Sequence, residues 1–154
     1  MVVKNSATLV LLVDGETHLG SYLKTSLQEV GFVVYLANNE QEALIQLQRF
    51  AVDLVLVDAR LLERTGPALC KAMRACRDVP IIVLSSSKLP EDMMFAYLAG
   101  ADDYIVKPFS LREVTVRIQR LAPYTRHRIG CEHVVCIDLG GPYGQENPHS
   151  TGGR

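Results

Sequence analysis

The stretch "LVLVDAR", Leu54–Arg60, places an aspartate directly after a run of branched aliphatic residues. Two other stretches have the same form. Leu11–Gly15, "LLVDG", places Asp14 after an apolar run, and Asp103–Phe109, "DYIVKPF", places Lys107 after another. Short apolar runs of this kind are typical of parallel strands that are covered on both faces. Because the carboxyl ends of parallel strands share one edge of a sheet, we expect two carboxylates and one ammonium group to meet there.

Strand candidates of this kind alternate with helix-period segments along most of the chain. Strand–helix–strand crossovers are right-handed in nearly all cases, so this alternation predicts an α/β fold. The expected architecture is (βα)5, a doubly wound parallel five-stranded sheet. The ligand crevice of such a sheet lies beyond the carboxyl ends of its strands. The strand candidates are Leu9–Val13, Val33–Leu36, Leu54–Val57, Ile81–Leu84 and Tyr104–Val106.

The helices are predicted from apolar stripes and from residues typical of helix ends. Leu19, Leu23, Leu27 and Val30 form one stripe, and Gly31 follows at the position of a left-handed cap. Capping side chains or first-turn prolines mark the starts of the second to fifth predicted helices. A glycine marks the end of the fourth. These signals are Asn39 with Glu42, Gly66–Pro67, Pro90 with Gly100, and Ser110 with Glu113.

Composition and charge exclude several classes of protein. The chain has 154 residues, of which 48% are hydrophobic and 21% charged, and its net charge is −1. This balance gives no electrostatic reason to expect that the chain alone binds nucleic acid or membranes. The apolar runs are too short to span a bilayer. The N-terminus "MVVKNSAT" lacks the features of a signal peptide, so we expect a cytoplasmic protein.

The chain changes character near residue 122, after which we find no helical stripe. We therefore predict a domain over residues 1–122 and a linker or tail over residues 123–154. One strand candidate in the tail cannot bury a core by itself. The tail is thus mobile, packed on the domain, or the beginning of an effector domain.

The tail also carries a pattern that suggests zinc. Cys131, His133 and Cys136 lie close together, and His127 or His149 would supply a fourth ligand. None of the usual CxxC spacings of structural zinc sites is present. We therefore interpret these cysteines as free thiols.

Four motifs together resemble one known family. They are "LVD", "LVLVDARLLERTG", "IIVLSSS" and "AGADDYIVKPF", each at the end of a predicted strand. In this order and spacing they resemble the receiver domain of two-component response regulators. The resemblance covers residues 7–122 and implies the flavodoxin-like strand order 2-1-3-4-5. The stretch "GADDYIVKPF" is especially similar to receivers that precede a winged-helix DNA-binding domain.

The resemblance implies a role for five residues. Asp58 matches the phosphoacceptor, which receives a phosphoryl group from a histidine kinase, and Lys107 matches the lysine that pairs with the phosphate. Ser85 matches the switch hydroxyl and Tyr104 the switch aromatic residue, although a strand-end serine and a half-buried tyrosine are also ordinary structural features. Pro108 matches a cis-proline. Phosphoryl transfer depends mainly on positioning and charge neutralisation, which such residues supply.

The resemblance also implies how the signal leaves the domain. The output surface would be the face formed by the helix after Pro90, strand Tyr104–Val106 and the last helix. In the family this face commonly forms a homodimer, and the output controls transcription through a separate effector domain. We expect a phosphoacceptor with at most weak self-catalysed phosphotransfer and dephosphorylation, rather than an enzyme.

The chain departs from the family at the metal site. The family has two adjacent acids after the first strand and binds Mg²⁺ there, but this chain has Asp14 followed by Gly15. The remaining expected ligands are Asp14, Asp58 and the backbone carbonyl of Arg60, with Glu16 either reaching back to the metal or beginning the first helix. Because Mg²⁺ demands near-octahedral oxygen geometry, we expect weakened Mg²⁺ binding.

Two further departures lie after the phosphoacceptor. The Arg60 guanidinium is either exposed or folded over to pair with Asp14 and Asp58, where it would replace part of the metal's charge. Leu62 replaces a common proline and is expected to loosen the loop.

Three alternatives stay open at this stage. The first is a phosphorylation-independent pseudo-receiver that acts as a protein–protein interaction module, which Gly15 favours. The second is an aspartate-nucleophile phosphatase, which would need a second aspartate where Arg60 stands. The third is a flavin or nucleotide binder, but "DGETHLG" lacks a glycine-rich phosphate loop.

Overall fold

The computed structural model describes residues 7–15 and 17–129. Its centre is one sheet of five parallel strands in the order β2-β1-β3-β4-β5, which confirms the predicted topology. The strand candidates were correct to within one residue at each end. The strands are β1 Leu9–Val13, β2 Val33–Ala37, β3 Leu54–Asp58, β4 Ile81–Ser85 and β5 Asp103–Val106.

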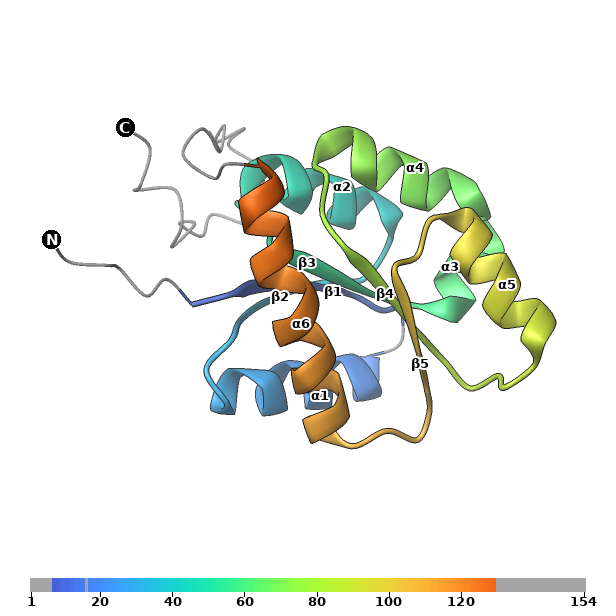
Figure 1. The fold of residues 1–154 in the computed structure, drawn as a ribbon, viewed down its shortest axis with the longest axis horizontal. Coiled ribbons are helices and arrows are strands. Elements are labelled where there is room, and N and C mark those ends of the chain that lie inside the picture. The colour runs from blue at the N-terminus through green and yellow to red at the C-terminus, as the bar shows by residue number, and fades with distance from the viewer. Residues whose placement is uncertain (1–6, 16, 130–154) are drawn as a thin grey trace, which may run out of the picture.

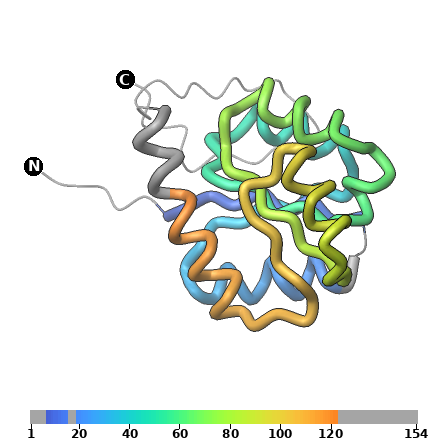
Figure 2. Tube along the Cα trace, turned by 45° about the vertical axis from the view of Figure 1, so that its right-hand side comes forward, coloured from blue at the N-terminus to red at the C-terminus, as the bar shows by residue number. Residues whose placement is uncertain are grey.

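Helices cover both faces of the sheet (Figure 1). Helices α2 to α5 pack on one face, and α1 and α6 lie side by side on the other, as Figures 1 and 2 both show. The near-continuous apolar strands thus contribute alternate residues to two cores. The helices are α1 Thr17–Glu29, α2 Glu40–Arg49, α3 Ala59–Thr65, α4 Pro67–Cys76, α5 Pro90–Ala99 and α6 Leu111–Ile129.

Helix α3 was not predicted, because its segment was interpreted as a loop. Asp58 caps it by accepting a hydrogen bond from the Arg60 amide at 2.8 Å. Leu62 does not loosen the segment, since it is buried in the core with Leu61. Gly66, with φ at +67°, ends α3 and allows α4 to begin at once. The helix expected as the fourth is therefore α5.

Most predicted helix ends are confirmed. The Glu42 amide donates to Asn39 Oδ1 at 2.9 Å, and the Glu113 amide donates to Ser110 Oγ at 3.1 Å. Gly31 has a φ of +107° and follows α1 as expected. Val30 is wrong as a core position, because α1 ends at Glu29 and leaves this side chain exposed.

The last helix runs further than expected. Helix α6 ends at Ile129, whereas the sequence showed no helical stripe after residue 122. Its inward positions, among them Val114 and Ile118, lie earlier in the helix. Residues 130–154, with the cysteines and histidines of the suggested zinc site other than His127, lie outside the described residues. Within the described part of the chain, no helix has both the length and the apolar character to cross a membrane.

Candidate functional site

The predicted site residues meet at the carboxyl edge of the sheet. Asp14 follows β1, Asp58 ends β3, Ser85 ends β4 and Lys107 follows β5. The Lys107 ammonium lies 2.7 Å from Asp58 Oδ2, and the Lys107 amide donates to the Ser85 carbonyl at 2.7 Å. The Lys107–Pro108 peptide bond is cis, as the sequence led us to expect.

The Asp58 carboxylate accepts three hydrogen bonds. Its side chain is buried, and its two oxygens are engaged on opposite sides. Oδ2 accepts from Lys107, while Oδ1 accepts from the backbone amide of Arg60 at 2.8 Å and from Arg60 Nε at 3.3 Å. Burial by itself raises the pKa of Asp58, but the hydrogen bonds from Lys107 and Arg60 outweigh it and hold the pKa below its ordinary value. The carboxylate is therefore charged at neutral pH.

An open pocket of about 470 Å³ lies in front of Asp58. Arg64 lines it, one helical turn after Arg60, and was missed in the sequence. Residues four apart lie on one face of a helix, so this spacing would have revealed Arg64 if the segment had been interpreted as helical. The residues that line the pocket include Asp14, Gly15, Asp58, Arg60, Glu63 and Arg64.

The described residues do not fit a divalent cation well. They contain no group of three or more acidic, histidine or cysteine side chains that could hold a metal ion. Both oxygens of Asp58 already accept hydrogen bonds from cationic residues. The carbonyl of Arg60 belongs to the first turn of α3, where helix geometry directs it to the amide of Arg64. Glu16, the tentative ligand, lies outside the described residues.

Ser85 and Tyr104 meet at the loop after β4. Ser85 Oγ accepts from the Ser87 amide at 3.0 Å, and the Tyr104 hydroxyl donates to the Ser87 carbonyl at 2.9 Å. The Tyr104 ring is buried against the core rather than half-buried. A shared loop thus connects the two predicted switch residues in an arrangement with the ring turned inward.

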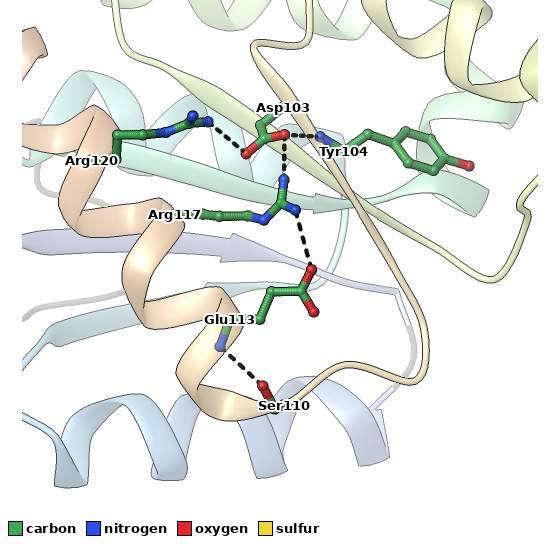
Figure 3. A network of polar contacts seen from close by, with 6 residues as sticks. All are labelled: Asp103, Tyr104, Ser110, Glu113, Arg117 and Arg120. Atoms are coloured by element: carbon green, nitrogen blue, oxygen red, sulfur yellow. Dashed lines mark hydrogen bonds and ion pairs between the residues drawn. The ribbon is translucent and has the colours of Figure 1, made fainter.

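A polar network joins β5 to α6 (Figure 3). Buried Asp103 accepts from Arg117 Nη1 at 2.7 Å, from Arg120 Nη2 at 3.2 Å and from the Tyr104 amide at 2.8 Å. Arg117 also contacts Glu113 at 3.2 Å. The Asp103 hydrogen bond raises the pKa of Arg117. The network fixes α6 against the strand that carries Tyr104.

Helix α5, beside this network, exposes apolar side chains. Leu98 is 81% exposed, and four other large apolar side chains on or next to this helix are exposed with it. Val116 on α6 adds to the exposed apolar surface. Such a surface is typical of a protein contact. The exposed apolar residues on or next to α5 are Leu89, Met94, Phe95, Tyr97 and Leu98.

Comparisons with known proteins agree with this geometry. The family described as "Response regulator receiver domain" matches residues 10–119. The chain is 36% identical over 112 residues to the "Probable transcriptional regulator ycf27" of Cyanidium caldarium, covering 73% of this chain and 45% of that protein. It is 35% identical over 112 residues to "Sensory transduction protein RegX3" of Mycolicibacterium smegmatis, covering 73% and 49%. The chain thus spans about half the length of these relatives.

Solved structures show the same likeness. A CheY-like receiver domain from Methanospirillum hungatei JF-1 has a TM-score of 0.71 and 26% identity, and the match covers 80% of this chain and 99% of that one. The receiver domain of sensor histidine kinase PA1611 from Pseudomonas aeruginosa PAO1 has a TM-score of 0.68 and 29% identity, covering 77% and 99%. That structure has a magnesium ion coordinated in its active-site cleft.

These findings settle the family. Receiver domains are phosphoacceptor signalling domains rather than ordinary enzymes, and they interact with histidine kinases. They bind Mg²⁺ at the active site, and the relatives matched here include transcriptional regulators. With its family match, its strand order and Asp58 at the end of β3, this chain belongs to the response regulator receiver domain family of two-component systems.

Proposed function

We propose that this chain is a phosphorylation-dependent signalling switch in the cytoplasm. Asp58 accepts a phosphoryl group from a histidine kinase, and the change is relayed to the face formed by α5, β5 and α6. The observation that carries the proposal is the 2.7 Å contact between Lys107 and Asp58 at the ends of two strands. An ammonium in this position can neutralise the charge of a phosphoryl group on Asp58.

The chemical step is a displacement at phosphorus. A carboxylate oxygen of Asp58 forms a bond to phosphorus while the bond from phosphorus to the donor's histidine nitrogen breaks. The electron pair of that bond stays on the nitrogen, and Asp58 becomes an acyl phosphate. The roles of this chain's residues are to position the carboxylate and to neutralise charge on the phosphoryl oxygens. Any self-catalysed phosphotransfer or dephosphorylation is weak.

The output passes through the switch residues. On phosphorylation the Ser85 hydroxyl exchanges the Ser87 amide for a phosphoryl oxygen, and Tyr104 follows the loop that both residues contact. The exposed apolar residues of α5 then form the contact surface of a homodimer. Transcription is controlled through an effector domain, since the relatives named above as regulators are about twice as long as the matched segment.

We also propose that dependence on Mg²⁺ is weakened. Asp14, Asp58 and the Arg60 carbonyl would remain as ligands, but Gly15 provides no carboxylate. Both oxygens of Asp58 already accept hydrogen bonds from Arg60 and Lys107, and the Arg60 carbonyl is directed along α3.

Intact-mass analysis with acetyl phosphate in saturating Mg²⁺ tests the switch. We expect the mass of one phosphoryl group to appear in the wild type and to be absent in Asp58→Asn. An Asp58→Asn protein that gains the same mass would place the phosphoryl group elsewhere. The absence of any gain in the wild type, with acetyl phosphate or a cognate kinase, would contradict the proposal.

Two observations favour a second function. Gly15 stands where a second acidic ligand is expected, and Tyr104 is buried with its hydroxyl donating to the Ser87 carbonyl. A pseudo-receiver that binds partners constitutively would use this arrangement. It would give the same oligomeric state and the same partner binding with and without acetyl phosphate.

A further inference from the structure

Gly15 and Arg64 both line the pocket in front of Asp58 and lie next to each other. A Cβ atom built on Gly15 would lie 3.4 Å from Arg64 Nη2 and 3.6 Å from the Asn38 carbonyl oxygen. The place where a second acidic side chain would begin is therefore next to a guanidinium group. A carboxylate at this position would pair with Arg64 rather than point into an open metal site.

Arg60 and Arg64 belong to the same short helix and line the same pocket. Their spacing of four residues places them one turn apart on one face of α3. Arg60 already contacts Asp58 through Nε, and Lys107 contacts the other oxygen. Cationic groups from two directions thus surround the predicted phosphoacceptor.

We propose that Arg64, with Arg60, takes the place of the divalent cation and holds the phosphoryl oxygens on Asp58 directly. This inference rests on the proposed phosphoacceptor function. Two guanidinium groups carry the same formal charge as one Mg²⁺ ion. A guanidinium is planar and matches the oxygens of a phosphoryl group through paired hydrogen bonds, which an ammonium cannot do.

The formal charges of the pocket are compatible with arginines in place of a metal ion. Among the described residues, Asp14, Asp58 and the exposed Glu63 are balanced by Arg60, Arg64 and Lys107. Phosphorylation replaces the single negative charge of the Asp58 carboxylate by a dianion, so it shifts this balance by only one charge, and the phosphoryl oxygens would meet donors on both sides of Asp58. The ligand that this pocket would hold without a bound metal is thus a phosphoryl group on Asp58. Beryllium fluoride mimics this group.

The test compares phosphorylation in metal-depleted buffer and in buffer with Mg²⁺. Acetyl phosphate donates the group: an Asp58 oxygen bonds to phosphorus, the bond from phosphorus to the acetate oxygen breaks, and acetate leaves with the electron pair. The proteins are the wild type, Arg64→Met and Gly15→Asp/Arg64→Met. Arg112→Met, at an exposed arginine of α6 that does not line the pocket, is the matched control.

We expect the wild type to be phosphorylated at similar rates in both buffers. Without metal, Arg64→Met should be slower by about tenfold, the loss typical of one charge-assisted hydrogen bond. Arg112→Met should match the wild type. The double variant, which exchanges a guanidinium for a carboxylate, should require Mg²⁺.

Two binding measurements serve as readouts that do not depend on turnover. ¹⁹F NMR should detect beryllium fluoride on the wild type without Mg²⁺, and weaker binding to Arg64→Met. Calorimetric titration with Mg²⁺ should give a saturable signal for the double variant and a much weaker one for the wild type.

The possible failures are distinguishable. Two results would overturn the proposal that the arginines replace the metal and leave the phosphoacceptor function standing. One is wild-type phosphorylation that occurs only with Mg²⁺. The other is an Arg64→Met protein that is phosphorylated without metal as fast as the wild type. If no variant gains a phosphoryl group in either buffer, from acetyl phosphate or from a cognate kinase, the proposed function itself fails and the inference fails with it.

Discussion

Asp58 combines burial with hydrogen bonds from cationic residues, and these act in opposite directions on its ionisation. Burial raises its pKa, the hydrogen bonds from Lys107 and Arg60 lower it, and the net pKa is below its ordinary value. A carboxyl with a lower pKa in the folded than in the unfolded chain stabilises the fold above the unfolded pKa of about 3.9. That contribution disappears as the pH falls through the folded pKa.

The first prediction follows from the lowered pKa of Asp58. The difference in unfolding free energy between the wild type and Asp58→Asn should be constant near neutral pH and should shift against the wild type below about pH 4. Urea denaturation at a series of pH values measures it. A difference that does not change with pH would show that the pKa of Asp58 is not lowered by folding.

Cys70 and Cys76 provide a second test at the scale of single residues. Burial raises the pKa of Cys70; nearby Arg74 lowers it and Asp102 raises it, with a net increase. Cys76 is partly exposed. At about pH 8, where reactive thiols begin to ionise, iodoacetamide should therefore modify Cys76 well before Cys70.

Peptide mapping by mass spectrometry separates these two thiols from Cys131 and Cys136. In strong denaturant Cys70 and Cys76 should react at similar rates, which serves as the control. Equal rates in the folded protein would contradict the burial of Cys70.

At the scale of elements, the strands were predictable and one helix was not. Apolar runs of four or five residues identify buried parallel strands clearly, because both faces of the sheet are covered. Helix α3 escaped prediction because it is short and begins directly after Asp58, which ends β3 and also serves as the N-cap of the helix. Its buried residues are Leu61 and Leu62, and a pair of adjacent residues has no helical period.

The missed helix α3 also explains which residues of the site were predicted. Strand ends brought Asp14, Asp58, Ser85 and Lys107 to one edge, and sequence reasoning found all four. Arg64 depends on the helical path of α3, so it could not be placed while that segment was interpreted as a loop.

Gly100 provides a prediction about the end of α5. Its φ is +122°, and a Cβ atom there would lie 3.3 Å from Cys70 Cβ. Gly31 also has positive φ, at +107°, but has no atom within 4 Å of that position. Alanine at a positive φ costs about 1–2 kcal/mol.

We therefore expect Gly31→Ala to lower the free energy of unfolding by about 1 kcal/mol through backbone strain alone. Gly100→Ala should lower it by about 2 kcal/mol or more, because contact with Cys70 adds to the strain. Urea denaturation of both variants measures the difference. Equal losses of unfolding free energy would mean that α4 and α5 shift to accommodate the added methyl group without cost.

At the scale of the whole molecule, the apolar surface of α5 lies next to the edge strand β5. Leu98 is its most exposed member, while Val30, also exposed, lies near the opposite edge strand β2. If the α5–β5–α6 face forms the homodimer, Leu98→Lys should weaken dimerisation after treatment with acetyl phosphate. Val30→Lys should dimerise like the wild type.

Light scattering coupled to size-exclusion chromatography measures both variants. Leu98→Lys should lose at least about tenfold in dimer affinity, since a central apolar contact is worth more than about 1.4 kcal/mol. Dimers of unchanged affinity would place the contact surface elsewhere.

The proximity of position 15 and Arg64 has a consequence for how this domain can evolve. A single replacement of Gly15 by aspartate would create an acid beside a guanidinium, so the first product would be an ion pair. The same replacement after the loss of Arg64 would create a metal ligand. The two substitutions are therefore epistatic, and the order in which a lineage acquires them decides whether the intermediate is a working receiver.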